Sequence, residues 1–220
     1  MGRKKLTKFA ETLTFPNFFQ PSRDEVFTQG FQWKGCWKDF FKNNNPIVLE
    51  LCCGRGEYTI GLAKMFPEKN FIGIDRKGAR MWQGCKYSIE NQMTNVAFLR
   101  MQIEMINHYF APDEVSEIWI TFPDPQPKKV NKRMTSPLFL DRYKQILSPE
   151  GTVNLKTDSP LMYEYTLEII EKMQYRISQN IEDIYVLPQI AEHLKIRTYY
   201  ENMWIDKGLT IRYLQFLLHQ

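Results

Sequence analysis

Three acidic side chains stand where apolar runs of the sequence give way to turns. Glu50 lies at the end of the run Ile47–Leu51 and is followed by Gly54-Arg-Gly56, and glycines in such a turn let the backbone pass close to a ligand. A dinucleotide-binding turn would carry a third glycine at position 59, where this chain has Thr59. An acid at the turn suits the ammonium of a methionine moiety better than a pyrophosphate. The alternative is an ordinary strand-to-helix turn beside a buried glutamate.

The second acid, Asp75, ends an apolar run about 20 residues beyond the glycines, the spacing at which a carboxylate reaches ribose hydroxyls in nucleotide-binding α/β folds. Aspartate is also a favoured helix N-cap, so capping is a competing and compatible role. After a third run comes Gln102, whose side-chain carbonyl can accept a hydrogen bond from an adenine amino group. Glu104 is the competing candidate for that contact, or an ordinary exposed residue.

The third acid, Asp124, lies in the proline-rich segment Phe122-Pro-Asp-Pro-Gln-Pro-Lys-Lys129. Prolines restrict the backbone around this carboxylate, which is what positioning a reactant requires. Ligands of open α/β sheets bind outside the carboxyl ends of the strands. We therefore expect Asp124 to face the same crevice as Glu50 and Asp75. The alternative is a proline-rich turn with an exposed aspartate.

An alternation of two kinds of segment predicts the elements that position these residues. Apolar, β-rich runs occur at Ile47–Leu51, Asn70–Ile74, Val96–Leu99, Glu117–Phe122 and Thr152–Leu155. Helical patterns occur at about Glu57–Phe66, Gly78–Gln92, Leu138–Leu147 and Pro160–Met173. This order predicts βαβ units, and hence an α/β fold with helices on both faces of a mostly parallel sheet. Two further strand-like runs, Glu182–Leu187 and Ile211–Leu218, have no strong helix between them and predict a C-terminal antiparallel hairpin, for seven strands in all.

Length and composition fit one folded domain. The chain has 220 residues, of which 43% are hydrophobic and 25% charged. Residues 1–45 are predicted to form a basic N-terminal arm and a helical extension, with a helix around Trp33–Lys42, and residues 46–220 the main domain. No apolar run is long enough to cross a bilayer and no signal-peptide pattern opens the chain, so we expect a cytoplasmic protein without membrane partners. The four cysteines show neither disulfide nor metal-ligand spacing, so no metal is expected.

Positive charge is concentrated in the first residues. The net charge is +4, and Arg3, Lys4, Lys5 and Lys8 precede the first acid, Glu11. Without those four cations, 25 basic residues balance 25 acidic ones. Affinity for a nucleic acid must therefore come from local patches and from this tail. A solvated, disordered terminus is the alternative interpretation.

Taken together, these motifs resemble the bacterial tRNA (guanine-N7)-methyltransferase family, whose hallmark after the fourth strand is Phe-Pro-Asp-Pro-Trp-Pro-Lys. The matching segments are Glu50-Leu-Cys-Cys-Gly-Arg-Gly56, Phe71-Ile-Gly-Ile-Asp75, Asn95-Val96 with Gln102, Phe122-Pro-Asp-Pro125, Lys156-Thr-Asp158 and Thr198-Tyr-Tyr-Glu201. The resemblance implies the Rossmann-like class I methyltransferase fold and S-adenosylmethionine as cofactor, with S-adenosylhomocysteine as its product. It also implies tRNA as substrate, with methyl transfer to N7 of the variable-loop guanine at tRNA position 46.

The same resemblance implies roles for single residues. The residues that would contact S-adenosylmethionine are Glu50, Gly54, Gly56, Asp75, Gln102 and Asp124, of which Asp124 would also be catalytic. Those that would contact the RNA or its target guanine are Lys128, Asp158, Thr198, Tyr199, Tyr200 and Glu201. Either tyrosine could stack on an exposed base or simply pack against the protein.

The chain departs from the family pattern at three places. Gln126 replaces the tryptophan of the hallmark, and Gln102 stands at the position of an aspartate. The basic run after the hallmark is two residues shorter, which predicts fewer phosphate contacts there. Three other functions stay open: a nucleotide-dependent reductase, a non-catalytic RNA-binding protein, and a methyltransferase with another substrate.

Overall fold

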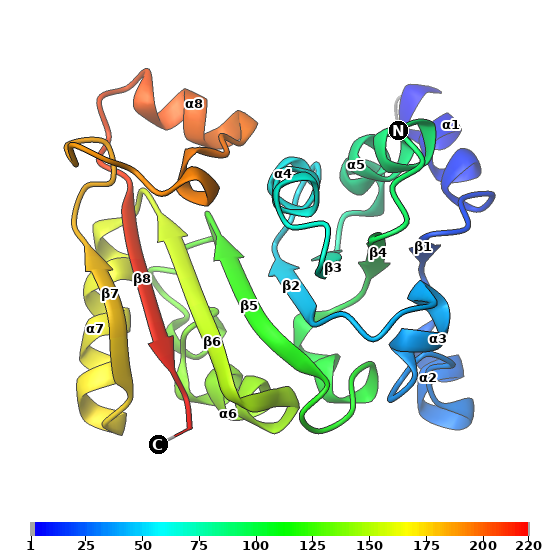
Figure 1. Cartoon of the computed structure of the whole chain (residues 1–220), viewed down its shortest axis with the longest axis horizontal. Helices are drawn as coiled ribbons and strands as arrows, with labels where there is room; N and C mark the ends of the chain where they lie inside the picture. Colours follow the sequence, from blue (N-terminus) through cyan, green and yellow to red (C-terminus); the bar gives the residue numbers. More distant parts are fainter. Residues whose placement is uncertain (1–2, 220) are drawn as a thin grey trace.

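One eight-stranded sheet runs through the part of the chain that the computed structural model describes, residues 3–219, with side chains from Leu6 onward (Figure 1). The strand order is β1-β4-β3-β2-β5-β6-β8-β7. Neighbours from β1 to β6 in this order are parallel, whereas β8 is antiparallel to both β6 and β7. The strands are β1 (Phe18–Phe19), β2 (Ile47–Leu51), β3 (Asn70–Asp75), β4 (Val96–Arg100), β5 (Val115–Thr121), β6 (Leu147–Thr157), β7 (Arg176–Ile181) and β8 (Arg212–Leu217).

Helices cover both faces of this sheet because its central strands are apolar on both sides. In β2, Leu49 and Leu51 join one hydrophobic cluster and Val48 joins the other. Residues of α3, α6 and α7 complete the first cluster, and residues of α4 and α5 the second. The helices are α1 (Arg3–Thr12), α2 (Arg23–Gln29), α3 (Trp37–Phe41), α4 (Glu57–Met65), α5 (Gly78–Glu90), α6 (Pro137–Ile146), α7 (Pro160–Met173) and α8 (Tyr199–Ile205), with 3₁₀ turns η1 (Ile103–His108), η2 (Val130–Lys132) and η3 (Glu192–Lys195).

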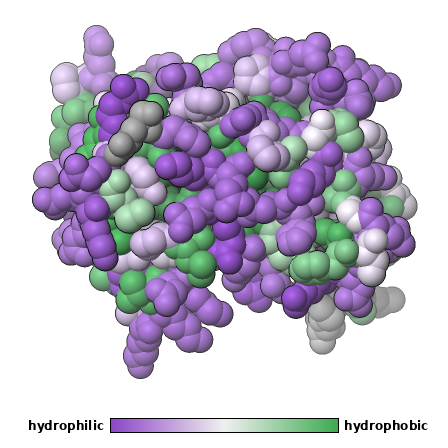
Figure 2. All heavy atoms as spheres, turned by 90° about the horizontal axis from the view of Figure 1, so that it is seen from below, coloured by the Kyte–Doolittle hydropathy of each residue, from purple (hydrophilic) through white to green (hydrophobic). Residues whose placement is uncertain are grey.

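The two ends of the parallel strands differ. The amino-terminal ends of β5 and β6 lie at the bottom of Figure 1, and the surface seen from that side is mainly hydrophilic (Figure 2). The carboxyl ends lie at the top, where α8 sits above the strands. The candidate residues of β2, β3, β5 and β6 therefore meet at the upper edge.

The predicted α/β fold class is confirmed, and the five predicted parallel strands coincide with β2 to β6. The sheet has eight strands and not seven, because two residues of the extension, Phe18 and Phe19, pair with β4. The helix predicted around Trp33–Lys42 is shorter and spans Trp37–Phe41. Lys42 ends it in the left-handed conformation, with φ of 56°.

The predicted strand Glu182–Leu187 is wrong. This segment is irregular, and the strand before β8 is Arg176–Ile181, whose residues are almost all exposed at the sheet edge. Ile184 gave the misleading apolar signal, because it is fully buried although it lies in no strand. The connection to β8 is also longer than predicted and contains η3 and α8.

The N-terminal residues lie against the sheet and α5. Backbone residues Arg3–Thr12 form α1, and the Asn17 side chain donates to Ser88 Oγ of α5 at 2.8 Å. The side chains of Arg3, Lys4 and Lys5, on which the prediction of a basic arm mainly rests, are outside the described residues. Over residues 3–219, no helix combines the length and apolar character needed to cross a bilayer.

Candidate active site

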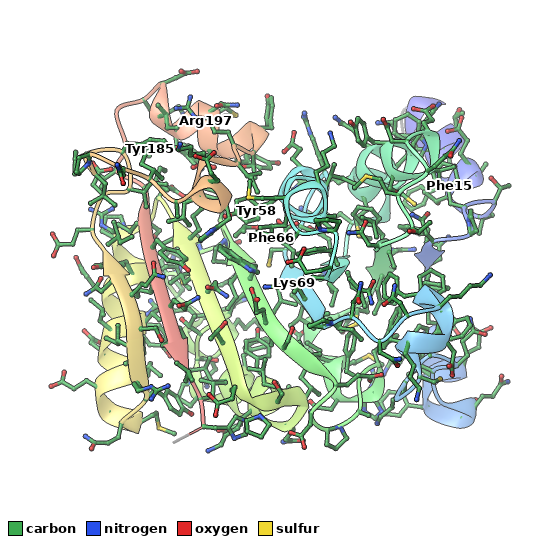
Figure 3. The ribbon with its side chains drawn as sticks, viewed as in Figure 1. Phe15, Tyr58, Phe66, Lys69, Tyr185 and Arg197 are labelled. Atoms are coloured by element: carbon green, nitrogen blue, oxygen red, sulfur yellow. The ribbon has the colours of Figure 1, made fainter. Side chains whose placement is uncertain are left out.

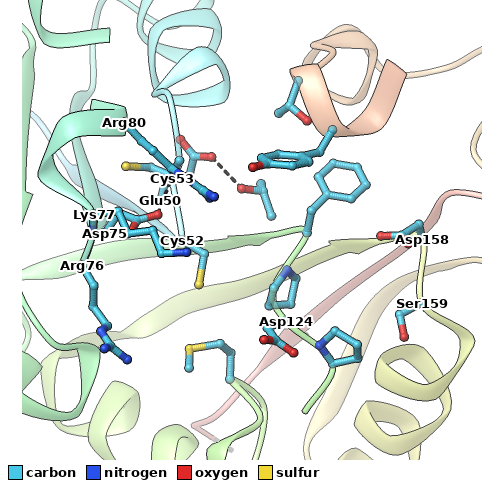
Figure 4. Close-up of a pocket in the computed structure, with 18 of the residues that line it drawn as sticks. Glu50, Cys52, Cys53, Asp75, Arg76, Lys77, Arg80, Asp124, Asp158 and Ser159 are labelled. Atoms are coloured by element: carbon cyan, nitrogen blue, oxygen red, sulfur yellow. Dashed lines mark hydrogen bonds between the residues drawn. The ribbon is translucent and has the colours of Figure 1, made fainter. Parts of the chain in front are cut away.

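A cavity of about 1040 Å³ opens at the carboxyl ends of β2, β3, β5 and β6 (Figure 4). The predicted residues that line it are Glu50, Gly54, Asp75, Asp124, Asp158, Thr198 and Tyr200. The predicted residues that do not line it are Gly56, Gln102, Lys128, Tyr199 and Glu201. Ligand pockets commonly measure about 300 to 1,000 Å³, so a nucleoside-sized cofactor and part of a second reactant would fit together.

Glu50 is a buried carboxylate in the wall of this cavity, with 3% of its surface exposed. Its Oε2 accepts hydrogen bonds from the Thr59 backbone N–H, at 2.7 Å, and from the Thr59 hydroxyl, while its Oε1 accepts from Thr121 Oγ1 at 2.6 Å. Burial raises the pKa of Glu50 to about 7, although the threonine hydrogen bonds act in the opposite direction. Among the side chains described, Leu6–His219, no basic group forms an ion pair with it. A cationic ligand group would supply the missing partner.

Asp75 fixes the turn that follows β2. Its Oδ2 accepts from the Gly54 N–H at 3.1 Å and its Oδ1 from the Lys77 N–H at 2.8 Å. The alternative role as the N-cap of α5 does not describe this geometry, because Lys77 is the N-cap residue and no side chain caps that helix. Asp75 thus joins the carboxyl ends of two neighbouring strands at the edge of the cavity.

The second glycine of the turn serves packing. Gly56 has φ of 76°, and a Cβ there would lie 2.6 Å from the Phe98 ring of β4. It would also lie 3.3 Å from Gly84 Cα of α5. Gly56 therefore lets the start of α4 approach β4 and α5 closely, whereas Gly54 lines the cavity.

Asp124 lies in a strained, well-anchored loop. Phe122 and Gln126 have φ of 48° and 45°, left-handed values that cost a non-glycine residue about 1 to 3 kcal/mol. Asp124 Oδ1 accepts from the Gln126 N–H at 3.0 Å, and Arg133 Nε donates to the Pro125 carbonyl at 3.2 Å. The carboxylate is exposed to the cavity on a backbone held from two sides.

Asp158 follows β6 across the cavity from Glu50 (Figure 4). It is half-buried, and burial raises the pKa of its carboxyl group. Lys128 is exposed and does not line the cavity, whereas Lys132 does. At the adenine-contact position, Gln102 is exposed and Glu104 is the residue that lines the cavity.

The Thr198–Glu201 segment begins α8 at the roof of the cavity. The Thr198 side chain accepts from the Glu201 N–H at 3.1 Å and the Glu201 carboxylate accepts from the Thr198 N–H at 3.4 Å, which forms a capping box. Tyr200 faces the cavity, while Tyr199 is 44% exposed and lies under the Arg55 guanidinium, 3.9 Å from its ring centroid. The segment is helical, although the sequence showed no strong helix between the last two predicted strands.

Lys156 had no predicted role, but its contacts join α8 and the segment before it to the sheet. Its Nζ, in β6, donates to the carbonyls of Leu194 and Ile196 at 2.9 and 3.0 Å and lies 2.7 Å from a Glu201 oxygen. Both side chains of this ion pair are fully buried, and Tyr185 Oη donates to Glu201 at 2.8 Å. Figure 3 shows Tyr185 in this roof above the sheet. The signals in the sequence were a lysine at the end of an apolar strand and its place in the family-like segment Lys156-Thr-Asp158.

A basic wall on one side of the cavity was also missed. Arg55, Arg76, Lys77 and Arg80 line it, and all four follow the carboxyl ends of β2 and β3. Arg80 lies 5.7 Å from the Tyr200 ring centroid, so the wall reaches the roof. The signal was the cluster of cations directly after two strand ends.

These residues fit S-adenosylmethionine. A buried carboxylate without a cation suits the ammonium of its methionine moiety, the glycine turn permits a close approach, and Asp75 lies at the strand end where ribose hydroxyls are bound in related folds. Among the side chains described, no cluster of His, Cys, Asp and Glu has the geometry of a metal site.

Sequence comparisons find methyltransferases that are similar to this chain. A protein-family model described as "Putative methyltransferase" matches residues 44–214. The chain is 52% identical to a Bacteroides fragilis protein named tRNA (guanine-N(7)-)-methyltransferase, over 100% of this chain and 88% of that protein. It is 49% identical to the protein of the same name from Christiangramia forsetii, over 98% and 99% of the two chains.

Solved structures support the fold. The 16S rRNA methyltransferase KamB superposes with a TM-score of 0.65 at 12% identity, over 84% of this chain and 93% of KamB. A SAM-dependent methyltransferase from Aquifex aeolicus superposes with a TM-score of 0.54 at 15% identity, over 95% and 97%. At these identities the likeness concerns the architecture alone.

Proposed function

The chain belongs to the tRNA (guanine-N7)-methyltransferase family, whose members use S-adenosylmethionine, and on that premise we propose that it methylates the variable-loop guanine at tRNA position 46 in the cytoplasm. The observation that carries the proposal is the buried, cation-free carboxylate of Glu50 beside the glycine turn, in a chain 52% identical over its full length to a protein of that name. Residues 46–220 would form the methyltransferase domain and residues 1–45 an extension to it.

Four residues would contact the cofactor. Glu50 would pair with its ammonium, the Gly54 backbone would lie beside it, and Asp75 would accept from its ribose hydroxyls. Glu104 lines the cavity where the adenine would lie, and Gln102 is the alternative contact from the neighbouring turn. Gly56 supports this pocket indirectly through the packing of α4 on Phe98.

When bound, S-adenosylmethionine supplies a methyl group on a sulfonium sulfur, so the lone pair of guanine N7 forms the new N–C bond as the C–S bond breaks. No residue has to remove a proton from N7, because this atom is a hydrogen-bond acceptor with a free lone pair. The protein's task is alignment, which in well-oriented reactions contributes about 7 to 11 kcal/mol.

Asp124 and Asp158 would orient the guanine from two strand ends. Their carboxylates are able to accept from the guanine N1 and N2 hydrogens, and they stabilise the positive charge that N7 methylation leaves on the base. The strain and the anchoring of the Phe122–Gln126 loop hold Asp124 for this task. Lys128 would meet a phosphate, and Tyr200 is the roof tyrosine that is placed to contact the base.

Transfer of labelled methyl groups to unmodified bulk tRNA, followed by nucleoside analysis, tests the proposal. We expect label in 7-methylguanosine, and its loss when the tRNA guanine at position 46 is replaced by adenine. Label in another nucleoside would refute the target. Cofactor binding without any transfer would favour a non-catalytic RNA-binding protein.

A further inference from the structure

The α1–α5 surface is a set of five cations beside the cavity: Lys8, Arg76, Lys77, Arg80 and Arg100. We propose that this surface binds the phosphate backbone of the tRNA, and that Trp82 of α5 holds α1 in place within it. The inference rests on the proposed function, because it names the surface that presents the tRNA to the cavity.

Trp82 is the centre of the contact between α1 and α5. Its Nε1 donates to Glu11 Oε2 of α1 at 2.5 Å, and Lys8 Nζ lies 4.4 Å from its ring centroid. Lys86 Nζ, from the next turn of α5, lies 5.1 Å from the same ring. A hydrogen bond from Trp82 to Glu11 and a cation–π contact from Lys8 therefore join α1 to α5 through one side chain, and Lys86 adds a contact within α5.

Arg100 connects this contact to the cavity. Its guanidinium lies 5.6 Å from the Phe9 ring of α1, and its Nε donates to the Arg76 carbonyl at 3.2 Å. Arg76 lines the cavity. Phe9 of α1 thus contacts Arg100, and Arg100 contacts Arg76 at the cavity. Lys77 and Arg80 follow Arg76 in the wall of the same cavity.

The charge of this surface is not compensated. Of the side chains from Leu6 to His219, no carboxylate lies within 4.0 Å of any of the five cations. Arg76, Lys77, Arg80 and Arg100 are exposed. Outside these five cations the sequence has 24 basic and 25 acidic residues, so this surface is a local excess of positive charge, and a polyanion with spaced phosphates is its complement.

A docked α1 and a flexible basic arm differ in the role that they give to Trp82. A flexible arm finds phosphates by its charge alone, so its contribution does not depend on where it is docked. A docked α1 adds Lys8 at a fixed place beside Arg100. Loss of the Trp82 contact then weakens tRNA binding although no charge has been removed.

The test measures the dissociation constant of unmodified tRNA at several salt concentrations, with S-adenosylhomocysteine binding measured in parallel. For Lys8→Ala and Trp82→Ala we expect the slope of log Kd against log salt to fall by about one unit each, which changes the ratio of Kd between 200 and 50 mM salt about fourfold. Trp82→Phe, which keeps a ring for Lys8, should lie between wild type and Trp82→Ala. The matched control is Lys38→Ala, an exposed cation at the opposite end of the strands. It should leave the slope unchanged, and S-adenosylhomocysteine affinity should be unchanged in every variant.

Each outcome separates two hypotheses. If the wild-type protein binds and methylates tRNA but Trp82→Ala has the same salt slope, the docked surface is overturned and the proposed function stays intact. A wild type that neither binds nor methylates tRNA would refute the proposed function. Equal competition by polyglutamate and by RNA would show that an acidic protein, and not a phosphate backbone, fits the surface.

Discussion

Cofactor affinity is expected to depend on the protonation of Glu50. Its carboxyl group has a pKa of about 7, raised by burial, and it must be ionised to pair with an ammonium group. Pairing lowers the pKa again, so binding releases a proton wherever Glu50 was protonated. The apparent Kd is then multiplied by one plus the ratio of protonated to ionised Glu50. Relative to pH 7.5, we expect Kd to rise about 1.5-fold at pH 7, about eightfold at pH 6 and about 25-fold at pH 5.5.

Isothermal titration of S-adenosylhomocysteine between pH 5.5 and 7.5 measures this dependence, since the α-amino group of the ligand stays largely protonated in that range. Buffers with different ionisation enthalpies report the released proton. Glu50→Gln should bind more weakly at pH 7.5 and lose most of the pH dependence. Asp158, whose pKa is also raised, is the other cavity group that could titrate, so Asp158→Asn is the control that should keep the wild-type slope. A flat wild-type profile, or an unchanged slope in Glu50→Gln, would refute the reasoning.

Three further predictions concern chemistry, positioning and packing. Asp124→Asn should lower kcat about 100-fold or more with little change in S-adenosylhomocysteine affinity, and retained turnover would remove Asp124 from the chemistry. Lys156→Met leaves Glu201 charged and buried, so it should raise the cofactor KM and lower the unfolding free energy by about 3 to 5 kcal/mol. The double variant Lys156→Met/Glu201→Gln should recover part of the cofactor KM and part of the unfolding free energy. If it recovers neither, Lys156 has no positioning role. Gly56→Ala should cost about 2 to 4 kcal/mol in urea unfolding because it adds overpacking against Phe98 to backbone strain. Gly208→Ala, with a φ of 72° and no atom within 4 Å, should cost only about 1 to 2 kcal/mol, and equal losses would refute the packing argument.

The sequence predicted the parallel part of the fold because its strands are continuously apolar and its glycine turn is local. It also indicated the acids at the strand ends, since the carboxyl ends of parallel strands meet at one edge. The prediction of secondary structure failed where tertiary contacts determine the conformation. The strand β7 is polar and exposed, so it carries no periodic signal, whereas Ile184 is apolar because it is buried in an irregular segment.

The sequence predicted only those site residues whose place follows from their position at the end of a strand. Glu201 matches a family motif, but its partner Lys156 is 45 residues away and their pairing is visible only in the folded chain. The basic wall likewise combines Arg55 with cations that follow another strand. Which of Gln102 and Glu104 faces the cavity depends on one turn of η1 and could not be read from residue types.

The position of β8 has a consequence for how the protein is made. This strand, Arg212–Leu217, lies between β6 and β7, and β8 is the only neighbour of β7 in the sheet. During translation β7 therefore waits without a partner until β8 has left the ribosome, and α8, just upstream of β8, emerges only shortly before it. A nascent chain can complete much of its parallel sheet before α8 and β8 emerge, but it gains the roof of its cavity only afterwards. Nascent chains that end before α8 should therefore neither capture the cofactor nor engage tRNA.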